Sequence, residues 1–200
     1  ADFTFSDAEL QEIFYAGLLH DVGKIGVREE VLTKNARLGP RVMQVVTLRL
    51  ALYAASIGED QEPLVRRLNA INSSASLSED DASFVEQLGR TSFGANGTRV
   101  PLLLPDEAEA LLTRTGNLTP SERREIERHP GESYRILQHI PFTANFQGLL
   151  QIIHQHHERL DGSGYPSGLK GREICMQARI LAVTDIYDAI TQERHYKSAL

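Results

Sequence analysis

Histidines beside carboxylates recur along this chain, and their types and spacing could hold metal ions. The seven histidines include His20, which precedes Asp21, then His129 before a proline, and the run His156-His157-Glu158. Imidazole and carboxylate together are ligands for Fe, Mn or Zn. A single histidine on a helix is more often a surface or core residue than a ligand. Only the combination therefore points to a metal centre.

Two further carboxylates, Asp185 and Asp188, lie in the most apolar segment of the chain. A carboxylate in an apolar helix is costly unless it is paired or bound to metal, although an aspartate there can also simply cap or pair. His156 and His157 would project about 100° apart on a helix. Both can reach one site only if that site holds more than one metal ion or if the helix is buried within the bundle.

The elements that must position these residues are indicated by apolar residues at three- and four-residue spacing. We expect helices over 7–23, 41–57, 78–89 and 106–112, others from 119 and from 149, and a last one over 177–191. The helix from 149 should carry His154, His156 and His157, and segment 177–191, apolar on nearly all faces, should be a buried central helix. We find no strand, hairpin or repeat, and 73–78 and 94–98 have loop composition. The expected fold class is all-α.

Composition sets further limits. Of 200 residues, 41% are hydrophobic and 24% charged, which excludes disorder and a coiled coil as global structures. The net charge of −6 argues against a duplex nucleic-acid partner. The single cysteine, Cys175, fits a reducing compartment, so we expect a cytoplasmic location. No stretch is long enough for a membrane span, and the start, without Met or a signal peptide, looks like an internal cut.

Four blocks of the sequence resemble the HD-GYP subfamily of HD-domain metal-dependent phosphohydrolases. They cover roughly residues 10–34 and 116–200, and the eleven-residue third block is the most specific. The blocks are His20-Asp21-Val22-Gly23-Lys24-Ile25-Gly26, His129-Pro130-Gly131, the run from His156 to Pro166, and the run from Asp185 to Lys197.

The resemblance implies a helical HD-domain bundle that holds two or three divalent metal ions, most often Fe and alternatively Mn. It implies hydrolysis of cyclic di-GMP to the linear dinucleotide, and it leaves open whether the product is hydrolysed further to GMP. The implied metal ligands are His20, Asp21, His129, His156, His157 and Asp185. Asp21 would be the bridging carboxylate and Lys24 would contact the scissile phosphate, which makes these two the catalytic residues. Lys24, Tyr165, Arg194 and Lys197 would bind the substrate.

The sequence departs from the subfamily pattern in two places. The subfamily supplies a further histidine, and in some members a glutamate, from a helix well before the HD pair. No histidine precedes His20 here, and Glu9 and Glu12 are too close to it to be matched. We therefore expect a catalytic domain, 1–34 and 116–200, that is truncated at both ends relative to the family, or an under-liganded first metal.

The second departure is a helical insertion, residues 35–115, between segments that the subfamily joins directly. It contains no histidine, cysteine or catalytic motif, and its Arg66-Arg67 pair should be a solvated face. We expect its ends to lie close together, because a long insertion then costs little loop-closure entropy. Its helices should need an apolar partner (the bundle, a second subunit or an upstream domain), and it should form a lid or interface beside the active site.

Two other functions remain open. The chain could be a catalytically weak module that binds a cyclic dinucleotide or a diguanylate-cyclase domain through its 162–168 loop, or it could hydrolyse a hybrid cyclic dinucleotide. An upstream sensory or receiver domain is a further expected partner in the full-length chain.

Overall fold

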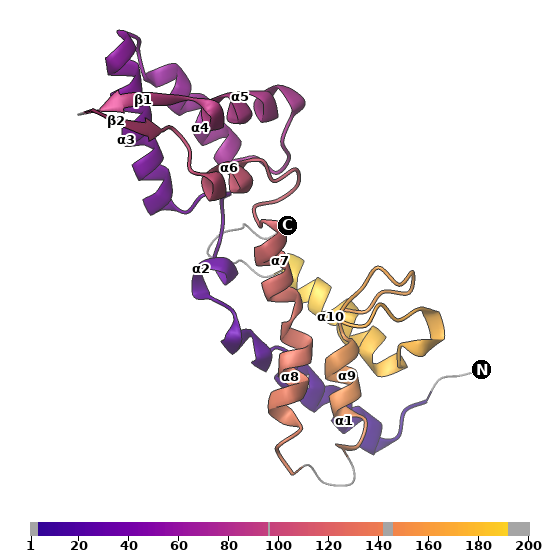
Figure 1. Cartoon of the computed structure of the whole chain (residues 1–200). Helices are drawn as coiled ribbons and strands as arrows, with labels where there is room; N and C mark the ends of the chain where they lie inside the picture. The colour runs from indigo at the N-terminus through magenta and orange to yellow at the C-terminus, as the bar shows by residue number, and fades with distance from the viewer. Residues whose placement is uncertain (1–3, 96, 142–145, 192–200) are drawn as a thin grey trace. The chain divides into compact units, whose positions relative to one another are not determined.

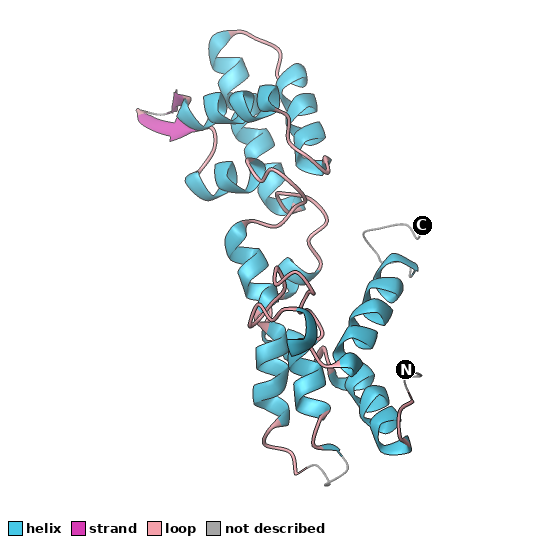
Figure 2. Ribbon diagram, turned by 90° about the vertical axis from the view of Figure 1, so that its right-hand side faces the viewer, coloured by secondary structure: helices cyan, strands magenta, loops and turns pink. Residues whose placement is uncertain are grey.

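The computed structural model describes residues 4–95, 97–141 and 146–191 of the chain (Figure 1). Figure 2 shows these residues as helices and connecting loops, with one small hairpin as the exception. The all-α prediction is confirmed. The chain divides into two compact units, one made of residues 1–32 and 123–200 and the other of residues 33–122.

The first unit is assembled from both ends of the chain. Its elements are α1 (Asp7–Leu19), η1 (Val22–Gly26), α2 (Glu29–Leu32), α8 (His129–Leu137), α9 (Leu149–Gln155), η3 (Gly171–Glu173) and α10 (Met176–Thr191). Helix α9 packs against α1, α8 and α10, and its buried face contributes Leu149, Ile152 and Ile153 to the core. This apolar helix therefore holds together the elements that bear the histidines.

The second unit has its own hydrophobic core. Its elements are α3 (Pro40–Ile57), α4 (Glu62–Ser73), α5 (Glu79–Arg90), β1 (Ser92–Ala95), β2 (Thr98–Pro101) and α6 (Pro105–Leu111). Fully buried residues such as Val46, Leu50, Leu68 and Val85 form the centre of this core. Helix α7 (Pro120–Glu127) runs across the boundary between the two units in the sequence.

Several expectations for the second unit were wrong. β1 and β2 form an antiparallel hairpin in which Ser92 pairs with Pro101 and Ala95 with Thr98. Gly97, with φ of +80°, follows β1, and the Asn-Gly pair in the sequence at 96–97 is the turn signal that indicates such a hairpin. Helix α4 was not expected at all. Helix α5 continues past Gly89 to Arg90, and α6 begins at Pro105 because Leu104 takes the N-cap position.

Helix α10 was expected to be buried on nearly all sides, and this is wrong for the described residues. Only Ala178 and Leu181 of this helix are buried, whereas Val183, Ile186 and Tyr187 are exposed. Among the described residues, α10 packs mainly on α9 and α1. An apolar sequence on every face shows that a helix can be buried, but the number of neighbours decides whether it is.

The ends of segment 35–115 lie close together, as expected. The Asn117 side-chain amide donates a hydrogen bond to the Lys34 carbonyl, and the Lys34 ammonium lies 2.7 Å from the Glu122 carboxylate. Inside the unit, Arg66 pairs with Glu62, and Arg67 pairs with Asp80 and Asp81, so both arginines are engaged on the surface.

No helix among the described residues is long and apolar enough to cross a membrane.

Candidate metal centre

The His20-Asp21 pair lies where α1 gives way to η1. Ser6 caps the start of α1 in a reciprocal hydrogen-bond pair with Glu9, and His20 ends the helix as its C-cap. Ser133 on α8 then holds the turn from across the unit. Its hydroxyl accepts a hydrogen bond from the Gly23 backbone nitrogen (2.8 Å) and donates one to the His20 carbonyl (2.6 Å). One buried hydroxyl thus fixes the backbone on both sides of Asp21.

Gly23 allows this close approach between η1 and α8. A Cβ added at Gly23 would overlap the His129 carbonyl oxygen and the Ser133 backbone nitrogen. Both are main-chain atoms, which cannot move aside as the end of a flexible side chain could. The glycine therefore allows the His20-Asp21 turn to sit directly on the first turn of α8, where His129 lies.

His156 and His157 reach the same site because the helix that leads to them stops. α9 ends at Gln155, His156 is its C-cap, and His157 already lies in the turn that follows. The two rings lie 4.1 Å apart between centroids. The expectation that both lie on the helix is wrong, and the end of the helix removes the 100° divergence expected for consecutive helical residues.

Three of the histidines have the same tautomer, and the backbone sets it. The Nδ1 of each ring lies 2.6–2.8 Å from the carbonyl oxygen three residues earlier, on Gly17, Ile126 and Ile153 for His20, His129 and His156 respectively. A carbonyl can only accept, so each Nδ1 carries the proton. In the neutral ring each Nε2 then presents a lone pair to the site, which is the form that a metal ligand requires.

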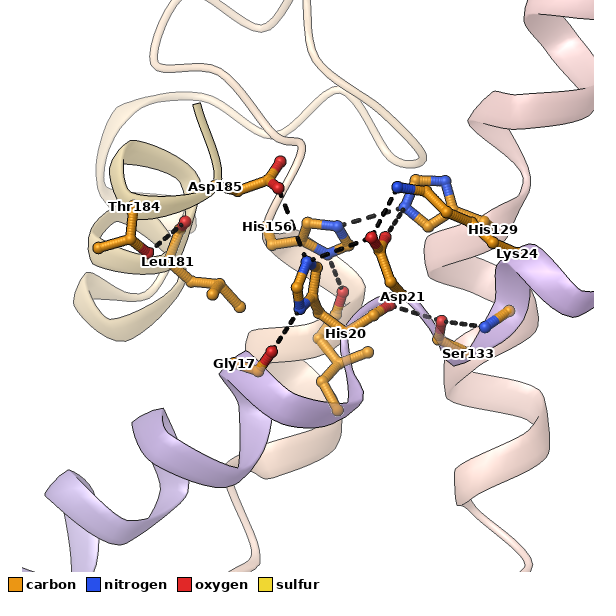
Figure 3. Close-up of polar contacts among 12 residues, drawn as sticks. Gly17, His20, Asp21, Lys24, His129, Ser133, His156, Leu181, Thr184 and Asp185 are labelled. Carbon is orange, nitrogen blue, oxygen red and sulfur yellow. Dashed lines mark hydrogen bonds and ion pairs between the residues drawn. The ribbon is translucent and has the colours of Figure 1, made fainter. Parts of the chain in front are cut away.

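These histidines surround the Asp21 side chain (Figure 3). The Nε2 atoms of His129 and His156 are 3.3 Å apart. Asp21 Oδ1 lies 3.2 Å from His129 Nε2, and Asp21 Oδ2 lies 3.5 Å from His20 Nε2. Each carboxylate oxygen therefore faces a different imidazole. His20 Nε2 and Asp21 Oδ1 are buried without any hydrogen-bond partner among the described residues.

The electrostatics of the site favour the ligand forms of His156, His157 and Asp21. Burial, together with the neighbouring His157, lowers the pKa of His156 to about 3. Burial and the nearby His129 lower the pKa of His157 to about 4. Burial opposes ionisation of Asp21, yet the Lys24 ammonium, 2.6 Å from Oδ2, holds the pKa of this carboxyl below its usual range. At neutral pH His156 and His157 are therefore neutral beside an ionised Asp21. Burial opposes protonation of His20, but the nearby Asp185 and Asp21 carboxylates outweigh it and raise the pKa of His20 above its usual value.

Two more of the expected site residues border this cluster. Asp185 on α10 places Oδ1 3.7 Å from His20 Nε2, an ion-pair distance that is too long for a hydrogen bond. Lys24 on η1 places its ammonium 2.6 Å from Asp21 Oδ2, with a third of its side chain exposed. Asp185 thus adds a second carboxylate on one side of His20, and Lys24 adds a positive charge that solvent can reach.

Tyr165 lies in the loop that follows the histidine pair. Its ring packs 4.8 Å from the His157 ring, and its backbone nitrogen donates a hydrogen bond to the His157 carbonyl. The loop is held by Glu158, whose buried carboxylate accepts hydrogen bonds from the backbone nitrogens of Ser167 (2.6 Å) and Leu169 (2.8 Å). A Cβ at Gly164 would overlap the backbone of residues 158–159.

Not every expected residue lies in the part of the chain that the structure describes. Arg194 and Lys197 lie outside it, so the structure does not place either of them. Glu9 and Glu12 have structural partners: Glu9 binds Ser6, and the buried Glu12 accepts a hydrogen bond from the Gly148 nitrogen.

Sequence reasoning missed two positioning residues, Ser133 and Glu158. Ser133 lies four residues after His129, the helical spacing that places it on the same face. Glu158 was quoted as part of a motif, but no role was given to it.

The residues present fit metal ions. Two groups have ligand atoms within 4.8 Å of one another, the first made of His129, His156 and His157 and the second of His20, Asp21 and His156. Two imidazole nitrogens bound to one ion, each at about 2.1 Å, lie roughly 3 Å apart, close to the separation seen here. Buried ligand atoms that lack a hydrogen-bond partner and face one another with their lone pairs repel, unless a cation lies between them.

Comparisons with known proteins agree with this description. A family model described as HD domain matches residues 100–200. The chain is 42% identical over 98 residues to a cyclic di-GMP phosphodiesterase response regulator of Xanthomonas campestris, covering 49% of this chain and 25% of the relative. A cyclic di-GMP phosphodiesterase of Thermotoga maritima is 41% identical over 48% of this chain and 25% of its own length.

A third relative carries a different substrate in its name. It is the 3'3'-cGAMP-specific phosphodiesterase 3 of Vibrio cholerae, 37% identical over 46% of this chain and 20% of the relative. The chain thus spans about a quarter or less of the length of these curated relatives.

Proposed function

This chain belongs to the HD domain family and is of the HD-GYP type, and from that membership and the site geometry we propose that it is a metal-dependent phosphodiesterase that hydrolyses cyclic di-GMP. Residues 1–34 and 116–200 would form its catalytic domain and residues 35–115 the insertion. The observation that carries the proposal is the convergence of the His20, His129 and His156 lone pairs on the ionised Asp21.

The proposed metal ligands are His20, Asp21, His129, His156, His157 and Asp185. Two overlapping donor groups that share His156 support a site for two or three divalent ions, Fe first and Mn as the alternative. Bound there, such ions would lower the pKa of a coordinated water and stabilise negative charge on phosphate oxygens. Asp21 would bridge, because its two oxygens face different imidazoles.

The remaining residues would bind and orient the phosphodiester. Lys24 holds its ammonium beside Asp21 with part of the side chain open to solvent, which suits a contact to the scissile phosphate. Tyr165 would present its ring next to His157 as a wall for a base or ribose. Arg194 and Lys197 complete the proposed substrate contacts on sequence grounds.

The substrate could instead be a hybrid cyclic dinucleotide, since one relative is named as 3'3'-cGAMP-specific. A competition assay with equal amounts of cyclic di-GMP and 3'3'-cGAMP separates the two. Faster hydrolysis of 3'3'-cGAMP would change the assigned substrate but not the reaction class.

The proposal also includes a location and a partner. A cytoplasmic location is supported by the single, half-buried Cys175, whose thiol pKa is raised by burial.

A diguanylate-cyclase domain is proposed to bind the 162–168 loop, which Glu158 holds in place and which exposes Pro166 and Ser167. In a pull-down with such a domain, Pro166→Ala should weaken binding, and equal capture by both forms would remove this partner.

The deciding experiment measures metal content and cyclic di-GMP turnover on the full-length protein that contains this chain. His156→Ala should lose metal and turnover together. The matched control is His154→Ala, because His154 lies two residues earlier on α9 and packs against Tyr134 instead of the cluster. A fully metal-loaded protein that binds cyclic di-GMP in calorimetry without releasing product would overturn the proposal in favour of a binding module.

A further inference from the structure

Helix α3 of the second unit has two apolar faces, of which the described residues cover only one. Met43, Val46 and Leu50 pack into the core of that unit, and Ala54 on the same face is buried. At about 100° per residue, the opposite face carries Val45, Leu48, Leu52 and Ala55. Of these, Val45 is 51% exposed, Leu48 60% and Leu52 59%. Leucines on the outer face of a helix that is already anchored by its inner face indicate a second partner.

The spacing of the exposed face is that of a helix–helix seam. Val45, Leu48, Leu52 and Ala55 are separated by three, four and three residues, the a and d positions of a heptad pattern. The positions beside the seam carry no unpaired charge: Gln44, Ala51 and Ser56 are neutral, and the Arg49 guanidinium is bound by the Glu107 carboxylate. Nothing on the flanks would repel an approaching helix.

The charges at the two ends of this seam are opposite. Arg41 lies four residues before Val45, in the first turn of α3, and Glu59 lies four residues after Ala55, directly beyond the C-cap Gly58. Both are exposed, and neither side chain has an ion-pair partner among the described residues. Each charge also sits at the unfavourable end of its own helix dipole, a cation at the N-terminus and a carboxylate at the C-terminus.

We propose that this face of α3 is a self-association surface that pairs antiparallel with the same face of a second copy of the chain. A twofold axis beside residue 50 puts Leu48 opposite Leu52 of the second copy and Val45 opposite Ala55. The same axis puts Arg41 opposite Glu59. Each apolar position then meets an apolar position of the second copy, as an isologous interface requires. Arg41 meets Glu59 at the negative C-terminal end of the second helix, and Glu59 meets Arg41 at its positive N-terminal end.

The charges also decide between the two directions. Parallel pairing would place Arg41 against Arg41 and Glu59 against Glu59, and like charges at an interface reduce association. The inference does not depend on the proposed phosphodiesterase function.

Sedimentation velocity and light scattering across a concentration series test this on the whole chain. Wild type should be a dimer, and Leu48→Glu should weaken dimerisation by about 100-fold or more, because it puts a charge at the centre of the seam. The control is Val183→Glu, at an apolar residue on α10 that is exposed to a similar extent, which should leave the dimer intact. A wild-type chain that stays monomeric, or a dimer lost in Val183→Glu and kept in Leu48→Glu, overturns the proposal.

A charge-reversal series tests the direction and register. Arg41→Glu and Glu59→Arg should each weaken the dimer, and the double variant should restore it, which parallel pairing does not predict. Absence of rescue overturns the antiparallel register. Should Leu48→Glu lose its helical circular dichroism, the milder pair Leu48→Gln with Leu52→Gln replaces it. Dimerisation unchanged in that folded variant would equally overturn the proposal.

Discussion

The Nε2 atoms of His129 and His156 lie 3.3 Å apart in the interior of the first unit, and each ring donates its Nδ1–H in a hydrogen bond to a backbone carbonyl. Neither neutral ring therefore has a proton with which to bridge the gap. The two lone pairs face one another next to an ionised carboxylate, so a cation between them would relieve the repulsion. The site is arranged for a ligand that the polypeptide itself does not supply.

Removal of metal should therefore destabilise this unit. A chelator should lower the midpoint of thermal unfolding of the wild-type protein, since an ion at 100 times its Kd adds about 2.7 kcal/mol of stability. His129→Ala should show a smaller shift with chelator than wild type, because it removes a ligand from one of the two donor groups and leaves the other intact. The measurement is differential scanning calorimetry with metal analysis of each sample, and an equal chelator shift in both proteins would contradict the assignment of His129 as a ligand.

Replacement of Gly23 by alanine should damage the site through the backbone. The added methyl would overlap the His129 carbonyl and the Ser133 nitrogen, so η1 must move away from α8 at a cost of about 2–4 kcal/mol. Gly26→Ala is the control, because a Cβ there meets no atom within 4 Å. Urea unfolding of the two variants should differ by most of that amount, and equal stabilities would show that η1 is not closely packed.

Glu158→Gln should loosen the loop that carries Tyr165. The carboxylate accepts hydrogen bonds from Ser167 and Leu169, whereas the amide has one oxygen to accept with and adds a donor, so a loss of about 1–3 kcal/mol is expected. Hydrogen exchange of the amides at 167 and 169 should speed up while the amides of α8 keep their protection. Glu132→Gln, at a partly exposed glutamate on α8, serves for comparison. Unchanged exchange at 167 and 169 would contradict this role for Glu158.

The Lys34–Glu122 pair predicts a pH-dependent contribution to stability. Burial alone would raise the pKa of Glu122, but the Lys34 ammonium and the Thr119 amide outweigh it and lower the pKa. A carboxyl with a lowered folded-state pKa stabilises the fold above its unfolded pKa, and the contribution is lost as pH falls through the folded value. Glu122→Gln should therefore be about 1–2 kcal/mol less stable than wild type at pH 7. The difference should shrink on acidification below about pH 4, and a pH-independent difference in urea midpoint would rule out this linkage.

Local patterns in the sequence were enough for the helices whose apolar spacing and caps agree. The Ser78 cap and the apolar residues after it indicated α5, and the all-α class followed from several such segments. α4 was missed although Leu64, Leu68 and Ile71 recur at four- and three-residue spacing. Its N-cap Gln61 makes no side-chain cap hydrogen bond, so its start lacks the signal that marks α5. For α10 the prediction was wrong in the opposite direction. Its apolar composition indicated a buried helix, but Val183, Ile186 and Tyr187 are exposed.

By itself, the sequence determined the order and spacing of the histidine and aspartate blocks, and with them the family of this protein. It also determined that segment 35–115 brings no histidine or cysteine to the site. Only the tertiary structure decided that His156 and His157 face the same space, because α9 ends at Gln155. It also decided how Ser133 and Gly23 seat Asp21 against α8. Periodicity reports how a side chain lies on its own helix, whereas ligand geometry depends on contacts between segments more than a hundred residues apart, which packing alone sets.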